Sequence, residues 1–207
     1  MAGDDAAFLT ALTTEHFGLA GARSTTVSES ASRSAFYLAS VSSTLIALGF
    51  VAQVADDTFR LFALAALPVL AFLGFATFMR VLESSIEDLF YARAIGRIRQ
   101  YYVELAGPER RHFFVLEPGD SIEIALRNMA VQPGRIQVLL TNQATVSVVN
   151  SAVIGAGTAI ACGALSASEA LSVGIGVIAL LLAVTAHQVY ARRRFEGGVA
   201  NVEALFP

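Results

Sequence analysis

The residues able to perform acid–base, nucleophilic or metal chemistry are few and scattered along this chain. The sequence holds three histidines, His16, His112 and His187, and one cysteine, Cys162. A lone cysteine excludes an intramolecular disulfide and a CxxC metal or redox site. The phosphate-binding, dinucleotide-binding, zinc-protease and serine-hydrolase motifs GxxxxGKS, GxGxxG, HExxH and GxSxG do not occur. We therefore expect a protein that is not an enzyme and takes no metal or cofactor.

The composition is that of a membrane protein. Of the 207 residues, 55% are hydrophobic and 15% are charged, whereas an average soluble domain carries about 25% charged residues. The formal net charge of −3 is the reverse of the basic surface that nucleic-acid binding needs, so we expect the lipid bilayer and no nucleic acid as partner. We predict an all-α fold, a four-helix transmembrane bundle of two hairpins, from four apolar segments: residues 35–55, 61–79, 136–165 and 170–190.

The most apolar of these segments, Leu61–Met79, contains no charged residue. At about 1.5 Å per residue, a helix of this length crosses most of a bilayer's hydrocarbon. A soluble bundle is the alternative, but a soluble helix needs a polar face and this one offers only Thr77. Because no Gly or Pro follows before Gly96, while acids and arginines become frequent, we expect the same helix to leave the membrane as a stalk.

The distribution of the arginines predicts the topology. Of 14 basic residues, all arginines, only Arg60 lies in the short connections 56–60 and 166–169. Since arginine-rich loops stay in the cytoplasm, we expect a multi-pass protein of the bacterial cytoplasmic (inner) membrane with both termini inside. The predicted organisation is a cytoplasmic N-terminal segment 1–34, a transmembrane hairpin 35–79, a cytoplasmic stalk and short helical segment 80–135, a second hairpin 136–191 and a cytoplasmic tail 192–207.

The N-terminal segment has the pattern of a short amphipathic helix. Phe8, Leu12, His16 and Leu19 fall on one helical face, which is expected to lie on the membrane surface or to pack on the stalk. A serine-rich stretch, 24–34, follows and is interpreted as a linker. The alternative is a helix that continues into the membrane, supported by an i, i+4 pair of opposite charges within that stretch.

The stalk carries a seam of apolar and aromatic residues at coiled-coil spacing: Tyr91, Ile95, Ile98, Tyr102 and Leu105. Such a seam either meets a second copy across an oligomer axis or covers the rest of the cytoplasmic segment. Three turn signals follow, Gly107-Pro108, Pro118-Gly119 and Pro133-Gly134, with a short helix between them that Asp120 or Ser121 caps.

Two basic residues in this region, Arg110 and Arg111, form a candidate contact for an anion or a lipid headgroup. Adjacent guanidinium groups suit phosphate. The alternative is that they only fix the membrane topology.

Small and polar residues recur every four positions in three of the apolar segments, as in helices that pack closely in lipid. In the third segment the repeat is polar, so it must turn away from lipid and either contact a neighbouring helix or line a wet path. The predicted bundle-facing or pore-facing residues are Gln143, Ser147, Asn150, Ser151 and Thr158, and the predicted helix-packing residues are Ala35, Ala39, Ser43 and Ala47 in the first segment and Gly176 and Ala183 in the fourth.

The stretch EHFGLAGARSTTVSESASRSAFYLASVSSTLIALGFVAQ, residues 15–53, and the stretch RVLESSIEDLFYARAIGRIRQYY, residues 80–102, carry a resemblance. They resemble small uncharacterised four-span integral membrane proteins of high-GC bacteria, a group that implies no activity. The order of a polar helix, two spans and a charged helix is also similar to SLATT-type and Pycsar-type membrane effectors of bacterial defence. That similarity implies assembly and damage to the inner membrane, and it transfers no functional residue.

Two functional hypotheses follow from these patterns. The first is a non-enzymatic homo-oligomer whose polar third segment lies at the bundle or oligomer centre and forms a pore or channel. The second is a membrane-anchored interaction or signalling module that recruits a cytoplasmic protein partner or anionic lipid. A membrane enzyme would require polar groups that converge around His187 and the stalk.

Overall fold

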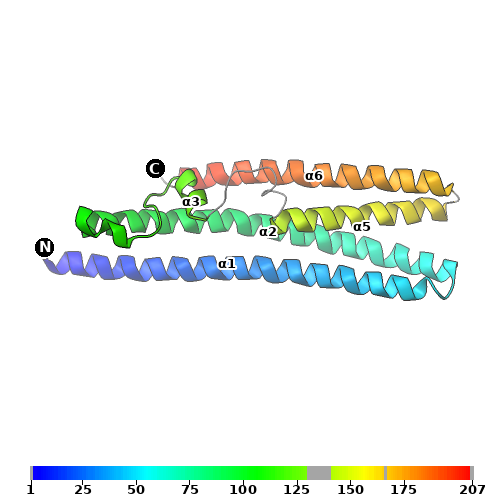
Figure 1. Ribbon diagram of the computed structural model, residues 1–207, viewed down its shortest axis with the longest axis horizontal. Helices are drawn as coiled ribbons and strands as arrows, with labels where there is room; N and C mark the ends of the chain where they lie inside the picture. The colour runs from blue at the N-terminus through cyan, green and yellow to red at the C-terminus, as the bar shows by residue number, and fades with distance from the viewer. Residues whose placement is uncertain (1, 130–140, 166, 206–207) are drawn as a thin grey trace. The chain divides into compact units, whose positions relative to one another are not determined.

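The structure is a computed structural model that describes residues 2–129, 141–165 and 167–205. Within these ranges every regular element is a helix and no strand occurs, which confirms the predicted all-α fold. The elements in chain order are α1 (Ala2–Val51), α2 (Asp56–Ala106), the 3-10 helix η1 (Pro108–Phe113), α3 (Ile122–Asn128), α5 (Asn142–Ala164) and α6 (Glu169–Ala204) (Figure 1).

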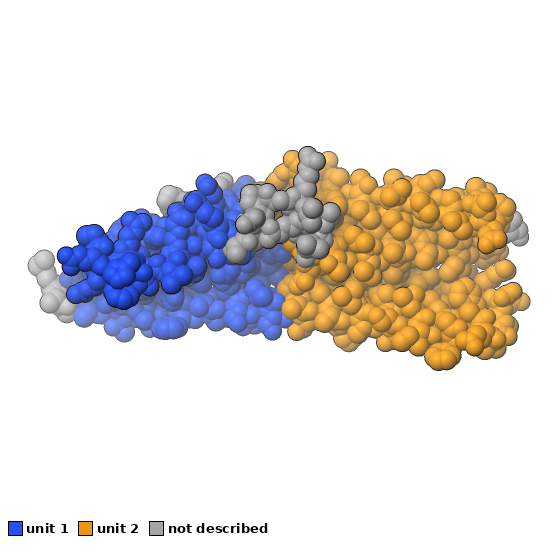
Figure 2. Space-filling view, in the orientation of Figure 1, with its two compact units in different colours: residues 1–29, 83–137, 198–207 blue, residues 30–82, 138–197 orange. Residues whose placement is uncertain are grey.

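The chain divides into two compact units (Figure 2). Unit 1 comprises residues 1–29, 83–137 and 198–207, and unit 2 comprises residues 30–82 and 138–197. Helices α1, α2 and α6 each contribute residues to both units. The first predicted hairpin, 35–79, lies within unit 2, and the Pro133-Gly134 turn signal lies outside the described residues.

Four helices, α1, α2, α5 and α6, are long and apolar enough to cross a membrane. Large apolar side chains of unit 2 point outward, with Phe36, Phe50, Leu61 and Phe72 between 68% and 74% exposed. An exposed apolar surface of this extent is unusual for a soluble monomer and ordinary for a helix bundle in lipid. The fold is therefore compatible with a multi-pass membrane protein.

The connection between α1 and α2 lies at residues 52–55, and not at 56–60 as predicted. Asp56 and Asp57 form the first turn of α2. Their carboxylates stabilise that turn because the N-terminus of a helix carries partial positive charge, so the acids extend the helix where a polar turn was expected.

The packing face of α1 in unit 2 differs from the predicted one. Ala35, Ala39 and Ser43 are exposed and Ala47 is half-buried, so the prediction that this stripe packs within the hairpin is wrong. The buried face is Ser34, Tyr37, Val41 and Leu48, which follow a spacing of three, four and seven on a neighbouring side of the helix. Tyr37, Val41 and Leu48 bury more apolar surface between the helices than the alanines would, and dispersion contacts between helices grow with the buried area.

Small residues do hold α5 and α6 together. A Cβ atom added at Gly155 would lie 2.8 Å from the carbonyl oxygen of Gly176, and one added at Gly176 would lie 2.7 Å from the Cβ of Ala159. The two backbones therefore touch where neither residue carries a side chain. Gly176, one of the predicted helix-packing residues, lies at this contact, and Ala183 is half-buried two turns further along α6.

In unit 1 the N-terminal part of α1 packs on the stalk, and the serine-rich stretch is helix and not linker. Phe8 meets Tyr101 edge-on at 5.5 Å, and Arg23 Nε donates to Asp88 Oδ1 at 2.7 Å. Thr26, inside the predicted linker, is 8% exposed. The correction has a simple cause, since tertiary packing outweighs the modest cost of serines in a helix.

The middle of the stalk's apolar seam is buried against other parts of unit 1. Ile95 and Ile98 are buried, Tyr91 and Tyr102 are half-buried, and Leu105 is exposed. Ser121 caps α3, because its Oγ accepts from Ile124 N at 3.2 Å. Gly107 and Gly119, from two predicted turn signals, have the positive φ angles of 78° and 133° that side chains disfavour.

Two glycines of α6 provide a matched test of the α5–α6 contact. Gly176→Ala places a methyl group against Ala159 and should destabilise the bundle by about 1 to 3 kcal/mol, as overpacking does. Gly174→Ala points into open space and should be neutral or slightly stabilising, because alanine favours helix. Unfolding in SDS followed by circular dichroism measures both, and equal effects would contradict the proposed contact.

Candidate functional site

A cluster of polar side chains lies in the interior of unit 2. Ser147, Asn150 and Ser151 of α5 have no exposed surface in the single chain, and Gln143 and Thr158 are half-buried. Three members of the predicted polar stripe therefore face the interior of one four-helix unit. Thr158 Oγ1 bonds to the carbonyl of Ile154 in its own helix, so its hydroxyl is satisfied locally.

Asn150 joins this stripe to two other helices. Tyr37 Oη of α1 lies 3.2 Å from Asn150 Oδ1, and His187 Nε2 of α6 lies 3.5 Å from Asn150 Nδ2. Tyr37 is fully buried and His187 is 7% exposed. The three groups form a continuous polar line across the interior of the unit, at a depth where unpaired amides are costly.

The fourth helix, α2, contributes a glycine where the amide approaches. A Cβ atom at Gly74 would lie 2.6 Å from Tyr37 Oη and would overlap Asn150 Oδ1. The absence of a side chain at Gly74 thus allows both polar groups to reach the α2 backbone. With its oxygen and nitrogen exchanged, the Asn150 amide donates to Ala71 O and Tyr37 Oη at 3.2 Å each and accepts from Phe75 N at 3.3 Å.

His187 is held in one orientation by its own helix and by aromatic rings. Its Nδ1 lies 2.7 Å from the carbonyl oxygen of Ala183, and a carbonyl only accepts, so Nδ1 carries a hydrogen. Phe78 packs edge-on against the imidazole at 4.7 Å and Phe75 at 6.4 Å. The ring is therefore fixed, with Nε2 directed at Asn150.

The cluster brings a serine close to a histidine, but this histidine cannot act as the base that activates the serine. Ser151 Oγ lies 3.5 Å from His187 Nδ1, yet it donates to the carbonyl of Ser147 at 2.7 Å. Because Nδ1 already carries a hydrogen for Ala183, it has no lone pair to accept the serine proton. What this arrangement can do is hold a hydrogen-bond network between the helices.

The described part of the chain contains no metal site, because no three of its His, Cys, Asp or Glu residues lie close enough together to hold an ion. Cys162 is half-buried with a free thiol. Within residues 2–129, 141–165 and 167–205, the structure thus brings together no ligand set for a zinc or iron ion.

Sequence analysis found the α5 residues of the polar cluster and missed two that complete it. Tyr37 lies on a different side of the helix from the small-residue stripe of the first segment, and Gly74 is one glycine in a long apolar segment. The available signal was Tyr37 itself, since a hydroxyl inside a membrane span needs a partner.

A second candidate site lies in unit 1, in the segment that follows α2. A hollow of about 520 Å³ is lined by Arg111 and His112 from η1. Its apolar lining includes Val103 of the stalk and Phe114, Val115 and Leu116 of the extended segment after η1. Beside it, Phe113 and Val115 are 74% and 94% exposed. Basic and apolar groups therefore share one concave surface.

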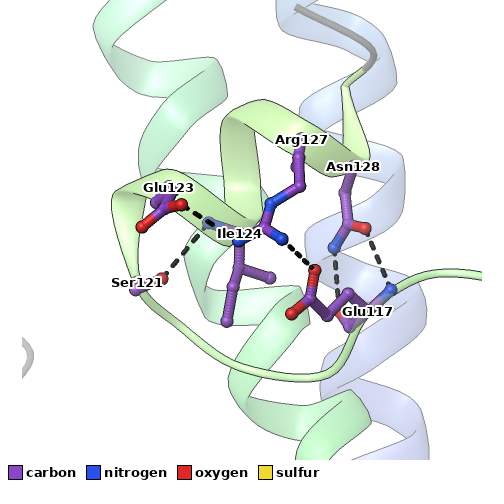
Figure 3. A network of polar contacts seen from close by, with 6 residues as sticks. All are labelled: Glu117, Ser121, Glu123, Ile124, Arg127 and Asn128. Atoms are coloured by element: carbon purple, nitrogen blue, oxygen red, sulfur yellow. Dashed lines mark hydrogen bonds and ion pairs between the residues drawn. The ribbon is translucent and has the colours of Figure 1, made fainter.

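Glu117, which lines this hollow, belongs to a polar network with α3 (Figure 3). Arg127 forms ion pairs with Glu117 at 3.3 Å and Glu123 at 3.1 Å. The Asn128 side chain exchanges two hydrogen bonds with the Glu117 backbone, at 2.8 and 3.0 Å. Glu117 lines the hollow, and its charge is thus offset by Arg127.

Arg110 and Arg111 are exposed, and neither forms an ion pair with a residue in the described ranges. The positive charge of η1 is therefore available to a ligand. The exposure of both arginines agrees with the predicted anion contact. What they bind stays a prediction.

A third histidine, His16, lies between α1 and the stalk in unit 1. Burial and the nearby positive charge of Arg99 lower the pKa of its imidazole. The pKa of Arg99 is lowered in turn by burial and by Arg23. His16 packs against the ring of Tyr102 at 5.9 Å, as an interface residue of the two helices.

Comparison with protein-family models, with curated proteins and with solved structures finds no match. The site geometry therefore carries the functional argument.

The approach of Asn150 to α2 is tested by a glycine pair. Gly74→Ala should displace Asn150 and Tyr37 and destabilise the bundle by about 1 to 3 kcal/mol through overpacking. Gly49→Ala, also in an apolar helix of unit 2 but with open space around it, should leave stability unchanged or raise it. Loss of folding in SDS titrations confined to Gly74→Ala supports the contact, and a stable Gly74→Ala protein would refute it.

Proposed function

We propose that this chain is a non-enzymatic protein of the bacterial inner membrane that anchors a cytoplasmic binding module, unit 1, for an acidic protein segment. The observation that carries the proposal is the concave surface of unit 1, which Arg111 and His112 line beside exposed apolar side chains; Arg110 is the preceding, exposed residue of η1. This is the second of the two hypotheses from the sequence.

Membrane anchoring is supported by the four long apolar helices and by the outward apolar surface of unit 2. The orientation is supported by the arginines, because Arg60 alone lies near the α1–α2 connection and Arg192, Arg193 and Arg194 follow the apolar part of α6. Both termini and unit 1 are then cytoplasmic.

An acidic protein segment fits the surface better than a lipid headgroup does. A hollow of about 520 Å³ has the volume of a ligand pocket and can enclose several side chains of a partner segment, whereas a bilayer offers a broad, nearly flat surface. Phe113 and Val115 add apolar area that an aromatic or aliphatic side chain of the partner would cover. Arginine is also the cation best suited to paired hydrogen bonds with carboxylates.

The pore hypothesis draws less support from this geometry. Ser147, Asn150 and Ser151 are enclosed within one chain, where Tyr37, Gly74 and His187 contact or adjoin them. A pore lined by these groups would have to break that network first. Homo-oligomerisation stays a prediction, and the exposed α1 stripe of Ala35, Ala39 and Ser43 is the surface of unit 2 that suits a second copy.

The topology is tested by cysteine labelling in a Cys162→Ser background. Val115→Cys, on a residue 94% exposed, should react with a membrane-impermeant maleimide only after the cells are opened. Val54→Cys in the α1–α2 connection, 77% exposed, should react in intact cells and serves as the control. Labelling of Val115→Cys in intact cells would overturn the proposed orientation.

Binding is tested on the full chain in nanodiscs of zwitterionic lipid, with fluorescent peptides rich in Glu and Phe as probes. Arg110→Gln/Arg111→Gln should weaken peptide binding by about ten- to a hundredfold, since loss of charge-assisted hydrogen bonds costs on the order of 1.5 to 3 kcal/mol. Fluorescence anisotropy measures the affinity.

The matched control for this experiment is Arg193→Gln/Arg194→Gln, which removes an equal charge from exposed positions of α6. It should leave the affinity unchanged. An equal loss of peptide affinity in both double variants would mean a general charge effect and would contradict the proposed site. If the protein binds anionic vesicles but not the peptides, its ligand is a lipid and not a protein.

A further inference from the structure

We propose that one end of unit 2 binds the phosphate groups of anionic phospholipids, through a band of five exposed arginines that the fold gathers at one level of the bundle. These arginines come from three helices: Arg33 of α1, Arg80 of α2, and Arg192, Arg193 and Arg194 of α6. The inference rests on the membrane anchoring proposed above and not on the acidic segment proposed for unit 1.

Contacts between the helices of unit 2 show which of their ends lie together. Residues of α5 lie beside residues of α2 and α6 in the pairs Asn150 with Gly74 and His187, Gly157 with Leu67, and Gly163 with Ser172. As the residue numbers rise along α5, the numbers of its neighbours therefore fall along α2 and along α6. Both helices run antiparallel to α5, and α1 runs antiparallel to α2 because the connection at residues 52–55 is short.

All five arginines lie beyond the level of Asn150, toward the same end of unit 2. Counted from the neighbours of Asn150, the steps along the chain are four residues from Tyr37 back to Arg33, six from Gly74 to Arg80, and five to seven from His187 to Arg192–Arg194. At about 1.5 Å per residue, the band lies about 6 to 11 Å beyond the amide along the bundle.

The charge of unit 2 differs between its two ends. At the arginine end the sequence of unit 2 holds one acid, Glu196, which pairs with Arg192 at 2.8 Å. The opposite end, at the two short connections, carries the acids Asp56, Asp57 and Glu169 and one arginine, Arg60. Anionic headgroups are therefore attracted to the first end and repelled by the second.

The arginines of α6 follow directly on a surface that suits lipid. Leu182 is 65% exposed and Val189 is 45% exposed. Arg193 lies on the same face as both, because it follows them by eleven and four residues, or about three turns and one turn. Exposed side chains that change from aliphatic to arginine within one turn mark the boundary between hydrocarbon and headgroups. The guanidinium groups thus lie at the depth of the lipid phosphates.

Two of these guanidinium groups are available to a ligand. Arg193 and Arg194 are exposed, and neither forms an ion pair with a residue in the described ranges. A guanidinium group donates two parallel hydrogen bonds, which match two oxygens of a phosphodiester. A zwitterionic lipid also carries a phosphate, but its own ammonium group offsets that charge, so an anionic lipid gains more from the contact.

The test uses an introduced tryptophan as reporter, because the sequence contains none. Leu182→Trp places the indole on the face of Arg193 and about 16 Å from it toward the middle of the bilayer. There, bromine atoms in the middle of the acyl chains of a lipid bound at Arg193 would quench the fluorescence. The full-length protein is reconstituted in liposomes with increasing fractions of brominated phosphatidylglycerol or brominated phosphatidylcholine. Phosphatidylglycerol should associate about fivefold more strongly, the ratio that corresponds to about 1 kcal/mol for a basic residue near headgroups.

Leu171→Trp is the matched control on the same helix. Leu171 is 56% exposed, lies on the same face eleven residues before Leu182, and is two residues from Glu169 at the opposite end. The ratio of the two association constants should be about one there. A ratio of about one for Leu182→Trp as well would overturn the inference.

Variants then assign the preference to the arginines. In the Leu182→Trp protein, Arg193→Gln/Arg194→Gln should lower the ratio at least twofold, while Arg110→Gln/Arg111→Gln in unit 1 should leave it unchanged. The inference fails if the ratio survives the α6 double variant or if both double variants lower it equally. Absence of quenching by either brominated lipid at both tryptophan positions would refute the membrane anchoring itself, so the two failures are distinguishable.

Discussion

The packing of unit 2 depends on where the carboxamide of Asn150 finds its partners. Asn150 is fully buried, and it meets a phenol from α1, the backbone of α2 and an imidazole from α6. A buried amide without partners costs several kilocalories per mole in an apolar medium, so the helices must stay where they satisfy it. Apolar contacts between helices in lipid carry no comparable directional demand, and the polar group therefore specifies which arrangement is adopted.

Part of this arrangement follows from sequence and part does not. The polar stripe of α5 and the small residues of α6 are local patterns, and the structure buries Ser147, Ser151 and Gly176 accordingly. The partners Tyr37 and Gly74 were missed because their role depends on which helices become neighbours. The stripe at Ala35 was assigned to the wrong side for the same reason, since spacing identifies a face but not what fills the space beside it.

The segments of unit 1 show the opposite balance. The serine-rich stretch was expected to be a linker on composition, but Arg23 pairs with Asp88 and Thr26 is buried, so contacts with the stalk hold it helical. The turn glycines and the Ser121 cap were predictable, because φ angles and capping bonds are determined within a few residues. The hollow beside η1 was not, since Val103 and Leu116 meet only after the chain has turned at Gly107.

The burial of three polar residues on one face of α5 also bears on biogenesis. A helix that presents Ser147, Asn150 and Ser151 to lipid on its own is a poor candidate for independent release from the insertion machinery. Helix α6 follows α5 after a short connection and packs against it at Gly155, four residues beyond Ser151. The amide is sheltered only once Tyr37 and Gly74 are present, and both are synthesised earlier in the chain. In chain order, two of the groups that enclose the Asn150 amide, Tyr37 and Gly74, therefore precede the polar segment, and a third, His187, follows it in α6.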